Sequence, residues 1–394
     1  MLMIFSGLRH EVGGDWLTYH ANALDYFELN FGYMSIFLTR DFLWEVSTVF
    51  SLLIGGGLIF HNLLMAIIFY VCLHQFIKRL PYYEIALITS FPIFTLILHM
   101  GYSRQSLAVA FTLLSINALI NKNTIKYFLW IIIGALFHKS ALLLLILLLS
   151  QINIKKNFKF QIQLSTILIR TFIFLLIIFS FYFIYAEYIH RLYFFYVGDG
   201  LHQSSGGSPY RCGLNFIAAL IYLSIIFKKV ENKQEQKIYF ILSICSIVFF
   251  FLQFYLSTFS DRLSFYIAPL QLYTWCYLLL FIKDKIIKLF TGFVLVSTYL
   301  LMLIIWFNLG ISRFTYIPYN NFITSNCIRS APHPEPFETI KTSKHKWSHF
   351  RLYTDYCDPM ITKFRYPQRA GFDSVMELKQ LQFFNRLKYD RNDN

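Results

Sequence analysis

The chain has 394 residues, of which 57% are hydrophobic and only 14% are charged, and its mean hydropathy is +0.52. Because soluble domains carry about 25% charged residues, this composition excludes a soluble globular protein and predicts an all-α polytopic integral membrane protein. The net charge is +14, but the basic residues form no stripe on a soluble module, so we expect no nucleic-acid partner.

Apolar runs recur along most of the chain. A helix that spans the membrane needs about 20 residues, and the runs that approach this length lie at 58–77, 84–100, 105–121, 127–150, 164–187, 213–227, 238–258, 263–282 and 289–309. They predict nine to ten transmembrane segments, with the run at 127–150 taken as a broken pair of helices. We therefore expect a membrane domain over residues 1–320 and a polar tail over residues 321–394.

Residues 1–57 precede the first of these runs. If that run leads inward to Lys78, these residues lie outside although no span precedes them. The opening letters MLMIFSGLRH are typical of the last turns of a helix, so we expect the natural protein to have a further span upstream of Met1. The alternative is that a short N-terminus crosses the membrane unaided.

The segment Gly7–Trp16, GLRHEVGGDW, carries the strongest motif. A Gly-Gly turn separates Arg9 from Asp15, and glycine permits backbone conformations that would let the two side chains face one another. A carboxylate beside an arginine is a candidate general base or an anchor for a sugar hydroxyl, and the arginine is a candidate ligand of pyrophosphate. The alternative is a salt-bridged loop with a structural role.

A second motif, GYSRQ, places Arg104 and Gln105 at the start of the run at 105–121. An arginine near a helix N-terminus is unfavourable for the helix macrodipole. A bound anion would offset that cost, and helix N-termini bind phosphate. We therefore predict that Arg104 and Gln105 bind pyrophosphate. The alternative is an arginine that snorkels to the membrane interface.

The run at 127–150 has lysines on both sides, namely Lys122, Lys126, Lys155, Lys156 and Lys159. A single span would place one of these clusters outside, whereas a re-entrant pair of half-helices keeps both inside. The pair would place His138 and Lys139 at a turn within the membrane, where ionisable residues are functional candidates. We predict that His138 is a second candidate base and Lys139 a pyrophosphate ligand. The alternative is one tilted helix.

The basic residues differ in kind between the two predicted sides. The inner ends carry mainly lysines, as the orientation rule requires, namely Lys78, Arg79, Lys122, Lys126, Lys155, Lys156, Lys159, Lys228, Lys229, Lys233, Lys237, Lys283, Lys285 and Lys288. The outer ends carry single basic residues that this rule does not explain, namely Arg9, Arg104, Lys139, Arg191, Arg211, Arg262 and Arg313. A guanidinium is a rigid fork of donors that matches phosphate.

We therefore expect the outer face to bind a pyrophosphate-bearing substrate. Arg191, Arg211 and Arg262 are reserve ligands in this interpretation, and pairing with Arg262 could be the whole role of Asp261. The polar tail is expected on the same, periplasmic side. Its stretch at 372–389 has apolar residues at near-helical spacing, which predicts an amphipathic surface helix that the chemistry does not need.

These motifs carry a resemblance to a known family. GLRHEVGGDWLTY, ELNFGY, YSRQSLAVA, FHKSA and the closing Tyr316-Ile317-Pro318-Tyr319 resemble the EpsG family, Wzy-type polymerases of bacterial surface glycans such as O-antigen. The resemblance covers about residues 5–320, and the tail departs from the family pattern. It implies a GT-C-like fold in the bacterial inner membrane, with an active site that faces the periplasm.

What the resemblance implies is a glycosyltransferase that joins oligosaccharide repeat units carried on undecaprenyl diphosphate. A hydroxyl of one lipid-linked unit would attack the anomeric carbon of the growing chain, and undecaprenyl diphosphate would leave, its charge stabilised by arginines. The expected partners are these lipid-linked glycans and membrane lipid, and a chain-length regulator is a further candidate. We expect no metal and no other cofactor.

Two other classes of protein share part of this pattern. A lipid-linked-glycan flippase or transporter would show internal repeats and polar residues through the midplane, whereas the charges here gather at the outer ends of the runs. An O-antigen ligase would share the outer arginines, and only the motifs disfavour it.

Overall fold

The computed structural model describes residues 1–10, 12–16, 19, 41–151, 205–310, 313, 315, 316, 319, 321 and 323. Arg191, the expected run at 164–187 and the expected tail helix at 372–389 lie outside these residues.

The described residues are helical, as the composition predicts, apart from turns and one isolated β-bridge between Arg9 and Asn321. The α-helices are α1 (Leu2–Gly7), α4 (Phe42–Leu53), α5 (Gly57–Ile77), α6 (Tyr83–Ser90), α7 (Ser103–Ile120), α8 (Thr124–Phe137), α10 (Ser208–Ile221), α11 (Lys233–Leu252), α12 (Ser257–Ile267), α13 (Pro269–Phe281) and α14 (Lys285–Leu309). The same part of the chain also contains two π-helices, η1 (Phe91–His99) and η4 (Tyr222–Ile226), and two 3-10 helices, η2 (Lys139–Gln151) and η5 (Phe227–Lys229).

Short polar side chains begin three of these helices. Asn123 caps α8, Asn232 caps α11 and Asp284 caps α14, and in each case a side-chain oxygen accepts a hydrogen bond from a backbone N–H of the first turn. These caps satisfy N–H groups that the start of a helix leaves without an intrahelical partner. They explain why the helices begin immediately after short polar connections.

The chain forms two compact units. The first unit consists of Met1–Asn30, Thr48–Leu63 and Ile311–Asn394. Within it, the ring of Tyr319 stacks on Phe5 with 4.6 Å between centroids, and the Tyr319 hydroxyl donates to the Phe5 carbonyl. The backbone N–H of Gly13 donates to the carbonyl of Thr315 at 2.9 Å. Phe5 and Gly13 near the N-terminus therefore pack against Tyr319 and Thr315 near the end of the membrane domain.

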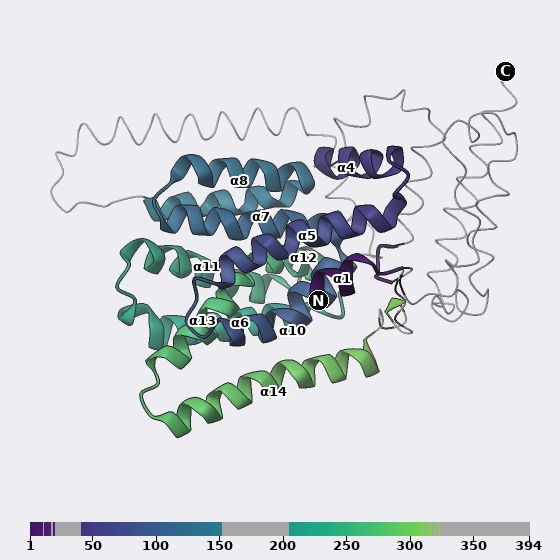
Figure 1. Cartoon of the computed structure of the whole chain (residues 1–394). Coiled ribbons are helices and arrows are strands. Elements are labelled where there is room, and N and C mark those ends of the chain that lie inside the picture. Colours follow the sequence, from purple (N-terminus) through teal and green to yellow (C-terminus); the bar gives the residue numbers. More distant parts are fainter. Residues whose placement is uncertain are drawn as a thin grey trace, which may run out of the picture. The chain divides into compact units, whose positions relative to one another are not determined.

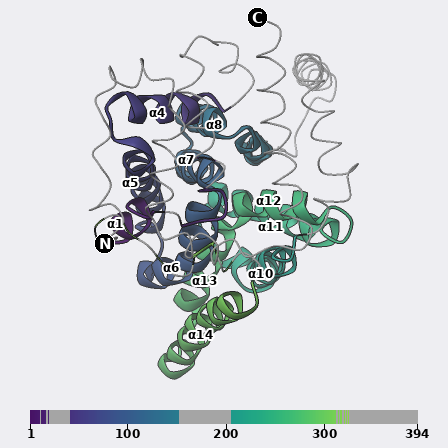
Figure 2. The same cartoon turned by 90° about the vertical axis from the view of Figure 1, so that its right-hand side faces the viewer.

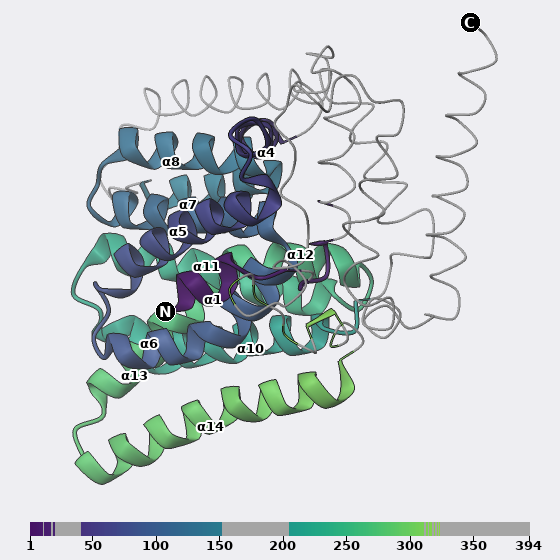
Figure 3. The same ribbon diagram turned by 45° about the vertical axis from the view of Figure 1, so that its right-hand side comes forward.

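The second unit consists of Phe31–Ser47 and Leu64–Gly310. Its helix α7 packs against α8, and α10 packs against α11, α12 and α13 (Figure 1). The long helix α14 packs against α6 and α13 and lies at the edge of this unit, as the turned views also show (Figures 2 and 3). Helix α7 is mostly buried and α14 is mostly exposed.

Small residues explain why α7 can lie inside the unit. Ser106, Ala108, Ala110, Thr112 and Ser115 all lie on this helix and are buried. Small side chains let neighbouring helix backbones approach closely. The hydroxyl groups of Ser106, Thr112 and Ser115 donate hydrogen bonds to backbone carbonyls of the preceding turn. Helix α7 can therefore run through the interior of the second unit.

We name the two ends of α7 by the basic residues that they carry. At the start of α7 lies Arg104, and this is the arginine end. Near the other end of α7, the Arg79 side chain donates to Asn117 Oδ1 at 2.6 Å, and Lys122 follows directly, so this is the lysine end. Arg104 and Asn117 are separated by about 20 Å of helix. Basic residues that the sequence analysis assigned to different sides thus lie at different ends of α7.

Five helices of the described part are long and apolar enough to cross a membrane, namely Gly57–Ile77, Ser103–Ile120, Ser208–Lys229, Lys233–Leu252 and Lys285–Leu309. A sixth span is possible if α12 and α13 are counted together. The expected total of nine to ten is therefore not confirmed.

The expected single run at 263–282 needs correction. The structure divides it at Ala268 into α12 and α13, which bend by 49°. Pro269 follows the break, and a proline lacks the N–H that would continue the helical ladder. Helix α4 is a second difference, because its 12 residues are too few for the length criterion that located the runs.

Candidate functional site

The helix pair α8 and η2 carries His138 and Lys139 to the arginine end. Helix α8 ends at Phe137, His138 is extended with φ −163° and ψ 121°, and η2 begins at Lys139. The Tyr127 hydroxyl of α8 donates to the Leu144 carbonyl of η2, so the two helices run back along one another. The structure thus agrees with the expected break at this turn.

Both outer ends of this pair lie at the lysine end. Helix α8 starts four residues after α7 ends, and Gln234 at the start of α11 donates to Ser150 Oγ at the end of η2 at 2.8 Å. Gly134 allows the close packing at the turn, since a Cβ there would lie 3.1 Å from the Ala108 carbonyl oxygen of α7. The pair therefore turns back on itself within the second unit.

Asp41 is a site residue that the sequence analysis missed. Its carboxylate Oδ2 lies 3.4 Å from an Arg104 terminal nitrogen, and it accepts a hydrogen bond from the backbone N–H of Lys139. Burial raises the pKa of the Asp41 carboxyl above its ordinary value, although the charges of Arg104 and Lys139 oppose this. The only signal in the sequence was a lone carboxylate directly before an apolar helix.

Arg262 lies on α12 and reaches the same end of the unit. Its guanidinium carbon lies 3.7 Å from the centroid of the Tyr102 ring, at the distance of a cation–π contact. Its carbonyl accepts from the Gln105 side chain at 2.5 Å, so Gln105 ties the start of α7 to α12. The Gln105 side chain thus binds the backbone of α12.

Three cationic side chains act on His138 electrostatically. Arg104, Arg262 and Lys139 all lie within electrostatic reach of its imidazole. The structure therefore brings together five residues that the sequence analysis singled out, namely Arg104, Gln105, His138, Lys139 and Arg262. Positive charge gathered at a turn of this kind attracts an anion, and arginine offers phosphate a planar pair of donors.

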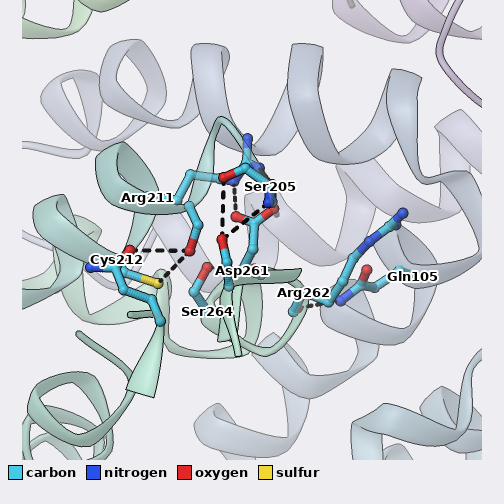
Figure 4. A network of polar contacts seen from close by, with 10 residues as sticks. Gln105, Ser205, Arg211, Cys212, Asp261, Arg262 and Ser264 are labelled. Carbon is cyan, nitrogen blue, oxygen red and sulfur yellow. Dashed lines mark hydrogen bonds and ion pairs between the residues drawn. The ribbon is translucent and has the colours of Figure 1, made fainter. Parts of the chain in front are cut away.

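Arg211 has a different environment from these cations. Its Nε donates to Asp261 Oδ1 at 2.5 Å, a second guanidinium nitrogen donates to Oδ2, and Ser205 Oγ donates to the same Oδ2 at 2.7 Å. Figure 4 shows Arg211 and Ser205 converging on Asp261, while Gln105 lies beside Arg262. Asp261, expected as the partner of Arg262, is held by Arg211 instead. The ion pair fixes the start of α12, from which Arg262 projects.

Arg9 and Asp15 belong to the first unit. The buried Arg9 side chain donates to the Val12 carbonyl at 3.1 Å and to the Ser6 carbonyl at 2.5 Å. Asp15 accepts from the Tyr19 hydroxyl at 3.3 Å. The backbone of Gly13 has φ +119°, a conformation that favours glycine. This loop thus folds around the arginine by means of the glycine turn that the motif contains.

The family comparison adds an identity to this geometry. The model of the EpsG family matches residues 1–321, which is most of the chain. The chain belongs to the EpsG family. The resemblance found in the motifs is therefore confirmed, and EpsG proteins are polysaccharide polymerase-like membrane proteins. The match ends where the polar tail begins. Neither a curated protein nor a solved structure matches this EpsG chain.

Proposed function

We propose that this EpsG protein polymerises oligosaccharide repeat units linked to undecaprenyl diphosphate at the periplasmic face of the bacterial inner membrane. The growing chain on one lipid is the donor, and a single lipid-linked unit is the acceptor. The observation that carries the proposal is the cluster of Arg104, Lys139 and Arg262 around the turn at His138.

The cluster suits a diphosphate better than a simple anion. Arg104 lies in the first turn of α7, whose start has no side-chain cap, so backbone N–H groups add to the attraction for a phosphate group. Lys139 supplies a compact charge, whereas an arginine can hold two phosphate oxygens at once. Asp41 occupies one part of the cluster and keeps Arg104 in place.

The reaction is a displacement at the anomeric carbon. The acceptor hydroxyl oxygen forms a bond to that carbon, the bond from the carbon to the diphosphate oxygen breaks, and undecaprenyl diphosphate leaves with the bonding electron pair. The hydroxyl proton passes to a base, for which Asp41 is our candidate, because burial raises the pKa of its carboxyl and so increases its basicity. Arginines stabilise the charge that develops on the leaving group.

The residues of the first unit and the ion pair between Arg211 and Asp261 have other roles in this proposal. Arg9 and Asp15 remain candidates for pyrophosphate and for a sugar hydroxyl, respectively. Arg211 acts through Asp261, because their ion pair sets the start of α12 and so the place of Arg262.

The test uses a deletion strain complemented with wild-type protein or single variants, and its readout is the ladder of chain lengths. Arg104→Lys should abolish long chains while one repeat unit is still displayed, because the substitution keeps the charge but removes the planar fork. The matched control is Arg79→Lys, the same change at the exposed lysine end. A null strain that displays no repeat unit would point to a flippase. Polymer stranded on the lipid carrier would point to a ligase, and either result would overturn the proposal.

A further inference from the structure

A chain of hydrogen bonds leads from a buried tyrosine to His138. The Tyr266 hydroxyl on α12 lies 2.7 Å from Ser140 Oγ, and Ser140 Oγ lies 2.5 Å from His138 Nδ1. Tyr266 is fully buried and His138 is half-buried. The chain joins α12 to the turn between α8 and η2 by side chains alone.

The backbone settles the direction of this chain. The backbone N–H of Ser140 also points to His138 Nδ1, at 3.4 Å, and a backbone N–H can only donate. Nδ1 is therefore an acceptor and carries no proton. Ser140 Oγ must then donate to Nδ1, and it accepts in turn from the Tyr266 hydroxyl. A neutral imidazole with no proton on Nδ1 carries its proton on Nε2.

The charges near the His138 ring also favour its neutral form. An imidazolium would need a proton on Nδ1, facing the Ser140 N–H. It would also add a fourth positive charge beside Arg104, Arg262 and Lys139, all within electrostatic reach. Like charges at such range disfavour the protonated ring.

We propose that Ser140 and Tyr266 are positioning residues, which hold His138 as the neutral tautomer that donates a hydrogen bond from Nε2. In this state His138 is a donor for an anionic oxygen and is not a base, which differs from the role that we expected from the sequence. The donor stands among three cations, so its ligand is an oxygen of the same anion that they bind. That this anion is a diphosphate leaving group rests on the proposed function, whereas the tautomer does not.

The role predicts which substitutions matter. Ser140→Thr keeps the hydroxyl and should retain activity, whereas Ser140→Ala removes the link and should lower kcat about tenfold, the equivalent of one hydrogen bond of about 1.4 kcal/mol. Tyr266→Phe keeps the ring and should lower kcat by less. The KM for the lipid-linked donor should change little, because the cations still bind its diphosphate.

The decisive measurement is the nitrogen chemical shifts of the histidine rings. Protein labelled with 15N-histidine is purified in detergent or nanodiscs, and a His138→Gln variant identifies the His138 signals. We expect the Nε2–H tautomer around neutral pH in the wild type and in Ser140→Thr. In Ser140→Ala only the long contact of the backbone N–H at 3.4 Å remains, so the Nε2–H tautomer should become less populated and the Nδ1–H tautomer should appear beside it.

The two kinds of failure can be told apart. An Nδ1–H tautomer or an imidazolium in the wild type overturns the positioning role, whatever the chain-length ladders show. The expected tautomer in a protein whose loss leaves polymerisation intact overturns the proposed function and leaves the positioning role in place.

Discussion

Two arginine–aspartate pairs in the second unit differ in their contact distances and in their burial. Arg211 grips both oxygens of Asp261, and their side chains are only 9% and 2% exposed. An Arg104 terminal nitrogen lies 3.4 Å from Asp41 Oδ2, and these side chains are 31% and 12% exposed. The same two residue types therefore form a buried, bidentate pair between α10 and α12, which we call the sealed pair, and a partly exposed pair between Asp41 and the start of α7, which we call the open pair.

The difference separates a structural role from a binding role. A bidentate, buried guanidinium has its donors engaged, and a ligand would have to break the pair and leave a buried carboxylate behind. The Arg104 guanidinium is only partly buried and its contact with Asp41 is longer, so donating to phosphate oxygens instead of to Asp41 costs less. Identical residue types in sequence thus acquire different functions from their burial and their partners.

Breaking the sealed pair should have the largest effect on stability. Arg211→Ala leaves Asp261 charged and buried, and removing one partner of a buried pair costs about 3–5 kcal/mol. Thermal unfolding in detergent, followed by size-exclusion chromatography, should show a large loss of folded protein. The double variant Arg211→Met with Asp261→Leu should recover much of this loss. Arg211→Ala protein as stable as the wild type would contradict the structural role.

Changing the open pair should instead affect activity and leave the fold in place. Arg104→Lys should change the free energy of unfolding by no more than about 1 kcal/mol, because the lysine keeps a positive charge beside Asp41 in a partly exposed pair. It should lower polymerisation by about 10- to 100-fold, because charge-assisted hydrogen bonds to the diphosphate are worth about 1.5–3 kcal/mol. Ladders and unfolding curves on the same preparations test both expectations. If stability and activity fell together, Arg104 would have a structural role like that of Arg211, and the proposed binding role would be wrong.

The pH dependence sharpens the role of Asp41. The base must be deprotonated, so activity should fall as the pH drops through its pKa, which burial raises. The Arg104 charge lowers this pKa, so Arg104→Gln should move the acidic limb to higher pH. Arg104→Lys keeps the charge and should leave the limb in place at a lower plateau.

Other titrating groups face this site, so the pH test needs a control. Glu45 and His138 also lie within electrostatic reach of Arg104. Asp41→Asn should remove the acidic limb together with most activity, whereas Glu45→Gln should leave the limb where it is. A limb that survives in an active Asp41→Asn variant would exclude Asp41 as the base.

The smallest expected effect concerns the ring beneath Arg262. Tyr102→Leu removes a cation–π contact worth about 0.5–2 kcal/mol, so polymerisation should fall severalfold. Tyr102→Phe keeps the ring and should behave like the wild type. Initial rates of chain extension measure the difference, and equal rates for Leu and Phe variants would show that the ring does not support Arg262.

The sequence predicted the parts of the site that depend on local pattern. The break at His138 followed from lysines on both sides of one run, and Arg104 with Gln105 followed from their place before a helix. Asp41 could not be found in this way, because its partners Arg104 and Lys139 are about 60 to 100 residues away in the chain. The different roles of Arg211 and Arg104 could not be predicted from the sequence either, since only tertiary contacts decide which guanidinium is buried against a carboxylate. The bend before Pro269 had a local signal, the proline itself, that a count of apolar residues overlooks.

The most direct test of the binding role is the affinity of the purified protein for undecaprenyl diphosphate, measured without any polymerisation. Wild-type protein should bind the diphosphate more tightly than undecaprenyl monophosphate. Arg104→Lys should weaken diphosphate binding by about 10- to 100-fold, and Arg79→Lys should leave it unchanged. Equal affinities of the wild type and Arg104→Lys for the diphosphate would contradict the account.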